Sequence, residues 1–123
     1  MKIFVFGNDI FPGDSTAVQL IPVLSKHFNK IDFIHADPTE NWYKEEKELT
    51  ILDTVVGIDN VTVFQSLDEF EEQARVTPHD YDVYVDLHLL MKIGKVKKLT
   101  IIGIPVKQSK QTIQQVEKII SRM

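Results

Sequence analysis

Two aspartates and a histidine each follow a hydrophobic run, at points where a strand would give way to a loop or a helix. They are Asp14, Asp53 and His79. In an open α/β sheet the carboxyl ends of the strands meet at one crevice, and ligands bind there. Two carboxylates and an imidazole in such a crevice supply the oxygen and nitrogen ligands that borderline divalent metal ions accept. The sequence therefore predicts a metal site built from three distant segments.

Each of these residues also has a simpler structural interpretation. Asp14 precedes Ser15 and Thr16, and any of the three side chains could cap the helix predicted to follow. Asp53 lies in the apolar run LTILDTVV, where a carboxylate is unfavourable unless it is hydrogen-bonded, paired or bound to metal. It could instead cap a neighbouring loop. His79, in the predicted loop TPHD, could hydrogen-bond to the backbone. Taken one at a time, the residues leave these alternatives open.

Three further residues lie where predicted strands end, and of these Asp37 could either border the same crevice or serve as a turn residue before Pro38. Gly7 and Asn8 follow the first apolar run, and Asp37 ends the second. Gly7-Asn8 is a weak candidate for a phosphate loop, because no GxGxxG pattern is present and the aspartate that opens the next helix would repel phosphate. A tight turn is the alternative. Packing or surface positions are predicted for the other histidines, His27, His35 and His88.

The composition limits the class of protein. With 123 residues, of which 43% are hydrophobic, the chain is expected to form one domain, 1–123, with a single core. The net charge of −4 argues against a nucleic-acid partner. The absence of cysteine excludes thiolate chemistry and fits a cytoplasmic protein. No apolar run reaches the roughly 20 residues that span a bilayer, so no membrane association is expected, and a monomer is the default.

The hydrophobic pattern predicts alternating strands and helices. Strands are expected at 2–6, 31–36, 49–56, 61–64 and 99–104. Helices are expected from Asp14 to Phe28 with a kink at Pro22, at 81–93 ending at Gly94, and at 110–121; segments 41–48 and 66–74 are polar helices or loops. The strands are continuously apolar, as in sheets covered on both faces. We therefore expect a three-layer α/β sandwich with a mostly parallel five-stranded sheet, in which 61–64 is a candidate antiparallel strand. The acidic residues of 40–48 and 68–72 are expected on solvated faces.

The order of these motifs resembles the hydrogenase maturation endopeptidases, which remove a C-terminal extension from the large subunit of nickel-iron hydrogenases. IFVFGNDIFPGDSTAV carries the family's apolar strand, Gly-Asn pair and acidic residue before a helix. ILDTV ends the third strand as the family's Val-Asp-Ala does. TPHDYDVYVDLHLLMKIGKVKKLTIIGIP matches the family's Ser/Thr-x-His loop, helix, glycine and strand ending in Gly-Ile-x-Pro most closely. ADPT keeps Asp37 and Thr39 but lacks the family's glycines, and the chain is shorter than typical members.

The resemblance implies a phosphorylase/hydrolase-like fold and a peptidase. It places both metal recognition and catalysis on Asp14, Asp53 and His79. It assigns accessory roles to Asp37, Gly7 and Asn8. In the family the nickel is carried by the substrate, so the implied partner is a nickel-loaded large-subunit precursor, and the free protein is expected to bind divalent metals weakly.

A different class of function stays open at this point. The same fold could serve as a non-catalytic α/β module that binds a metal or a small molecule. A phosphoacceptor domain is disfavoured, because it needs an acidic pair after the first strand and the sequence KIFVFGND supplies only Asp9. A serine hydrolase is disfavoured because Ser15 stands in no GxSxG motif.

Overall fold

The protein is described here from a computed structural model that covers residues 1–7, 16–36, 46–75, 78–107 and 109–123. The strands are β1 (Lys2–Val5), β2 (Asp32–His35), β3 (Glu48–Val55), β4 (Thr62–Phe64) and β5 (Lys98–Pro105). The helices are α1 (Thr16–Gln19), α2 (Ile21–His27), α3 (Leu67–Gln73), α4 (Pro78–Lys92) and α5 (Lys110–Ser121). None of the described helices is both long and apolar enough to cross a membrane.

The strands form one five-stranded sheet in the order β2-β1-β3-β5-β4. The first four of these strands run parallel, and β4 pairs antiparallel with β5. The sheet is therefore mixed, and the candidate antiparallel strand at 61–64 is confirmed as β4. The two longest strands, β3 and β5, lie side by side over their whole length, from Glu48 beside Lys98 to Val55 beside Pro105.

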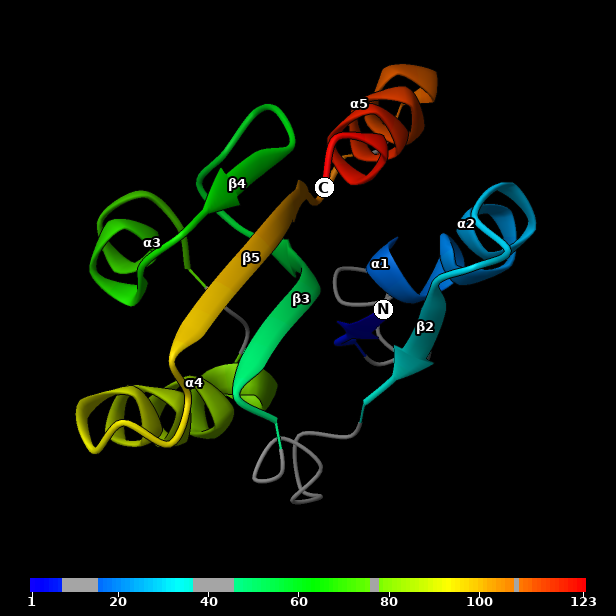
Figure 1. The fold of residues 1–123 in the computed structure, drawn as a ribbon. Coiled ribbons are helices and arrows are strands. Elements are labelled where there is room, and N and C mark those ends of the chain that lie inside the picture. The colour runs from blue at the N-terminus through cyan, green and yellow to red at the C-terminus, as the bar shows by residue number, and fades with distance from the viewer. Residues whose placement is uncertain (8–15, 37–45, 76–77, 108) are drawn as a thin grey trace.

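Helices cover both faces of this sheet (Figure 1). Alternate side chains of β3 point to opposite faces, as strand geometry requires. Leu49 and Ile51 pack with α3 and α4 in one buried cluster, whereas Leu52 packs with α1, α2 and α5 in a second. The predicted three-layer α/β sandwich is confirmed, and its two cores explain why the strands read as continuous apolar runs.

The described strands agree with the sequence-based bounds to within one residue at either end. The prediction of one kinked helix up to Phe28 was wrong, because α1 and α2 are separate helices. Pro22 lies in the first turn of α2, where its missing N–H is tolerated because a first-turn N–H has no partner within the helix. The acidic segment 66–74 is a helix, α3, capped by the Ser66 hydroxyl, which accepts from the backbone N–H of Glu69 at 3.1 Å.

The helix α4 begins earlier than the sequence pattern predicted. Pro78 and His79, expected in a loop, form its first turn. Proline suits this position because its fixed φ is helical and a first-turn N–H would have no helical partner. The helix ends before Gly94, whose φ of +80° is the left-handed conformation that glycine adopts readily. The predicted end of the helix at this glycine is confirmed.

Candidate functional site

Asp53 lies near the carboxyl end of β3 and is fully buried. Side chains alternate along β3, so the side chain of Asp53 points to the same face as that of Ile51 and away from that of Leu52. This face is the one that α4 covers. There the hydroxyl of Tyr84 donates a hydrogen bond to Asp53 Oδ2 at 2.9 Å. A charged acceptor buried away from water requires such donors, because transfer of an ionised carboxylate into a protein interior is otherwise strongly unfavourable. The sequence predicted the need for a partner, and Tyr84 is one.

The ring of Tyr84 is held in place by other aromatic side chains. Phe70 of α3 stacks on it at 5.0 Å between ring centroids, and Phe6 meets it edge-on at 5.9 Å. Phe64 in turn meets Phe70 edge-on at 5.1 Å. Such offset and edge-to-face pairs are favourable beyond the area they bury. The aromatic cluster therefore fixes the direction in which the Tyr84 hydroxyl meets Asp53.

Thr54, the next residue of β3, ties the opposite face of the sheet to α1. Its buried hydroxyl oxygen accepts a hydrogen bond from the backbone N–H of Ala17 at 3.0 Å. Ala17 lies in the first turn of α1, where backbone N–H groups have no helical partner. The carboxyl end of β3 is thus linked to the start of α1 on one face and to α4 on the other.

The end of β1 has its own contact with β2. The carbonyl oxygen of Gly7 lies 2.7 Å from Nε2 of His35, an arrangement in which the imidazole donates. Gly7 has a φ of +146°, which favours glycine over residues with a side chain. The turn predicted at Gly7-Asn8 continues outside the described residues. His35 ends β2, beside the carboxyl end of β1.

The structure describes only some of the predicted site residues. Asn8, Asp14 and Asp37 lie outside the described residues. His79 is placed by its backbone in the first turn of α4, and its side chain is outside the described part. Of the three predicted metal ligands, Asp53 is the one whose side chain the structure describes. Its contacts join it to α4, which carries His79, while the adjacent Thr54 contacts the start of α1.

Two residues of this region were missed by the sequence reasoning. Tyr84 lies beside Val83 and one turn before Leu87 on the buried side of α4, so its burial could have been inferred from helical spacing. No local pattern, however, pairs it with Asp53, which is 31 residues away in the chain. No role was predicted for Thr54, whose contact with Ala17 of α1 spans 37 residues.

Two surface hollows lie at opposite ends of the two longest strands. The smaller, of about 260 Å³, lies at the carboxyl ends of β3 and β5, between Val56, Ile58, Val106 and Lys107. The larger, of about 380 Å³, lies at their amino ends, near Thr50 and Thr100. Ligands of open α/β sheets bind outside the carboxyl ends. The smaller hollow is therefore the better placed of the two, since its lining begins at Val55, two residues after Asp53.

Chemically, the site offers a buried carboxylate with a positioned phenol. A carboxylate in this setting can bind a divalent ion or accept a proton from water. Both roles require contact with a ligand, whereas the side chain of Asp53 is 0% exposed. Any ligand that reaches Asp53 must therefore be accompanied by a movement that uncovers it.

Comparison with known proteins gives one structural relationship. No protein-family model matches the sequence, and no curated protein matches it either. Among solved structures, the hydrogenase maturating endopeptidase HybD from E. coli superposes with a TM-score of 0.61 at 18% sequence identity. The match covers 99% of this chain and 86% of that one. The fold expected from the sequence motifs is confirmed: this chain is folded as HybD is.

Proposed function

We propose that this protein is an endopeptidase that removes the C-terminal extension of a nickel-loaded [NiFe] hydrogenase large-subunit precursor. The observation that carries the proposal is the fold shared with HybD over 99% of the chain, together with Asp53 near the carboxyl edge of the sheet. This is the strand position to which the family resemblance assigns a metal-recognising aspartate. The motifs and the fold thus point to the same activity by separate routes.

The arrangement of the described backbone supports a common site for Asp14, Asp53 and His79. Ala17, three positions after Asp14, is hydrogen-bonded to Thr54, the neighbour of Asp53. His79 precedes Tyr84 by five positions on α4, which is roughly 7.5 Å of helix rise, and Tyr84 contacts Asp53. Ala17 and Tyr84, the described neighbours of Asp14 and His79 in the chain, therefore both contact the carboxyl-terminal part of β3.

In this proposal the nickel belongs to the substrate. Two carboxylates and an imidazole suit a borderline divalent ion, so they would recognise a precursor in which nickel has already been inserted. A carboxylate that is not occupied as a ligand, Asp14 or Asp53, would act as general base. It would take a proton from water as the water oxygen attacks the scissile carbonyl carbon, and the C–N bond would then break with proton delivery to the leaving amine. Asp37, Gly7 and Asn8 would position the substrate tail.

The residue assignment is tested with a purified nickel-loaded precursor and single substitutions. Asp14→Asn, Asp53→Asn and His79→Gln are each expected to abolish loss of the C-terminal peptide, measured by mass spectrometry. Asp32→Asn and His27→Gln are matched controls on exposed residues of β2 and α2. They should cleave as the wild type does. Normal cleavage by Asp53→Asn would remove Asp53 from both of its proposed roles.

The alternative function is a metal- or small-molecule-binding module of the same fold without catalysis. The full burial of Asp53 and its hydrogen bond with Tyr84 support a structural role for this carboxylate, and a module in which Asp53 only stabilises the fold would bind its ligand through other residues. The same cleavage experiment distinguishes the two functions. A module would bind the precursor or a divalent ion and release no peptide from any nickel-loaded precursor.

A further inference from the structure

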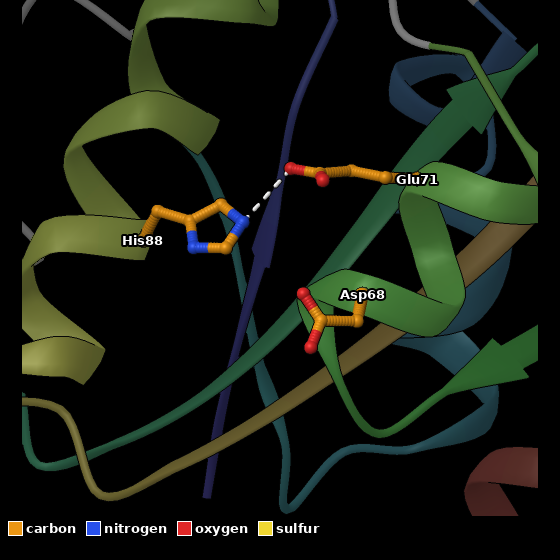
Figure 2. A group of neighbouring side chains, drawn as sticks. All are labelled: Asp68, Glu71 and His88. Atoms are coloured by element: carbon orange, nitrogen blue, oxygen red, sulfur yellow. Dashed lines mark ion pairs between the residues drawn. The ribbon is translucent and has the colours of Figure 1, made fainter.

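A second group of potential metal ligands lies on the surface between α3 and α4. Asp68 and Glu71 lie one turn apart on α3, and His88 projects toward them from α4 (Figure 2). One ligand atom from each residue lies within 4.8 Å of the others. Nε2 of His88 is 2.9 Å from Oε1 of Glu71. Two ligands of a tetrahedral zinc ion are roughly 3.5 Å apart, given bonds of about 2.0–2.2 Å, so small side-chain rotations would complete the geometry.

The two helices that carry this group are held together beneath it. Phe70, the neighbour of Glu71, stacks on Tyr84, which precedes His88 by one helical turn on α4. Both rings are buried, whereas the three polar side chains above them are exposed. The buried stack thus sets the spacing between the two helix surfaces. A metal site is strongest when its ligands project from rigid elements already at the right separation, and this condition is met here.

The electrostatic surroundings also favour a cation. The sequence of α3, LDEFEEQ, contains four carboxylates and no basic residue. Like charges this close on one helix repel one another, and a bound divalent ion would relieve the repulsion. The imidazole adds the nitrogen ligand that distinguishes a transition-metal site from a purely acidic surface, which would suit magnesium or calcium.

We propose that Asp68, Glu71 and His88 form a surface site for a borderline divalent transition-metal ion such as Zn²⁺ or Ni²⁺. Each carboxylate would supply one oxygen and His88 its Nε2, with water in the remaining positions. The ion would replace the direct contact between His88 and Glu71 and would clamp α3 to α4. The site is separate from the Asp14, Asp53 and His79 group and does not rest on the proposed peptidase activity.

The test is calorimetric titration of the full chain with Zn²⁺ and with Ni²⁺. Loss of a residue that only orients a metal ligand typically lowers affinity about 10–100-fold. Asp68→Asn, Glu71→Gln and His88→Ala should therefore each weaken binding of one equivalent of metal by at least about tenfold. All three residues are exposed, so these variants should fold, and circular dichroism checks that they do. Zn²⁺ should also shift the imidazole signals of His88 in NMR spectra.

Two control variants make the result specific. Glu72→Gln removes the same charge from the same helix at a position outside the group, and His27→Ala removes an exposed histidine of α2. Both should keep wild-type affinity. Equal weakening by Glu72→Gln and Glu71→Gln would show diffuse attraction to an acidic helix and would overturn the proposal. Absence of binding at millimolar Zn²⁺ would do the same, leaving only an ion pair between the helices.

Discussion

At the scale of single residues, the hydrogen bond between Tyr84 and Asp53 is the best-defined contact of the candidate site. The sequence identified Asp53 because a carboxylate in an apolar strand needs compensation. It did not identify the compensating residue, because a hydrogen bond between positions 31 residues apart leaves no local pattern. A residue's need for a partner can therefore be predicted from its neighbours in sequence, whereas the partner depends on the packing of α4 against the sheet.

Removal of the Tyr84 hydroxyl should destabilise the protein. Tyr84→Phe keeps the stack on Phe70 but leaves Asp53 without this donor, so the free energy of unfolding should fall by about 1–3 kcal/mol. Urea-induced unfolding measures the change. In an Asp53→Asn background the same substitution should have a smaller effect, because a neutral amide oxygen accepts a weaker hydrogen bond. Equal effects in both backgrounds would mean that the hydroxyl does not interact with the Asp53 carboxylate.

The link between Thr54 and α1 makes a second prediction at this scale. Thr54→Val keeps the shape of the side chain but removes the oxygen that accepts from Ala17, so unfolding free energy should fall by about 1 kcal/mol. Thr100→Val is the matched control, since Thr100 is also buried and its hydroxyl makes no hydrogen bond within the described part of the chain. If both variants lost the same stability in urea, the contact with α1 would contribute nothing specific.

At the scale of secondary-structure elements, the sequence was most informative about strands. Continuous apolar runs bounded by turn residues placed every strand to within one residue, because burial on both faces leaves few polar positions. Helix starts were harder. The first turn of α4 contains Pro78, which was interpreted as a loop signal although proline is also favourable at the first position of a helix. Whether such a proline lies in a loop or in the first turn of a helix depends on tertiary packing.

The pairing of β3 with β5 also explains the glycine of the Gly-Ile-Pro sequence that ends β5, residues 103–105. Gly103 lies beside Asp53 in the register, and an added Cβ would stand 3.0 Å from Val55 and 3.1 Å from Phe64. Gly103→Ala should therefore lower the free energy of unfolding by about 1–3 kcal/mol, measured by urea titration. Gly94→Asn tests backbone strain without crowding: nothing lies within 4 Å of an added Cβ, and asparagine tolerates the φ of +80° better than most residues with a side chain, so its loss of stability should be smaller. A neutral Gly103→Ala would show that β3 and β4 yield easily at this point.

At the scale of the whole molecule, the layer architecture and the mixed sheet were predictable, and the fold shared with HybD confirms them. The candidate site was predictable only in part. Residue types at strand ends indicated where ligands gather, because sheet topology brings those ends together. The sequence placed Asp68 and Glu71 on a solvated face and His88 at a packing or surface position, without bringing them together. They lie on different helices, and the separation of these helices is set by buried aromatic rings that the sequence does not position.

We propose that this protein cleaves a hydrogenase large-subunit precursor only after nickel has been inserted. The most direct test incubates the wild-type protein with the same large-subunit precursor in nickel-loaded and nickel-free forms and measures the mass of each product. We predict that the nickel-loaded form loses a C-terminal peptide and that the nickel-free form keeps its full mass. Cleavage of both forms alike would contradict nickel recognition, and an intact mass for both would contradict the peptidase itself.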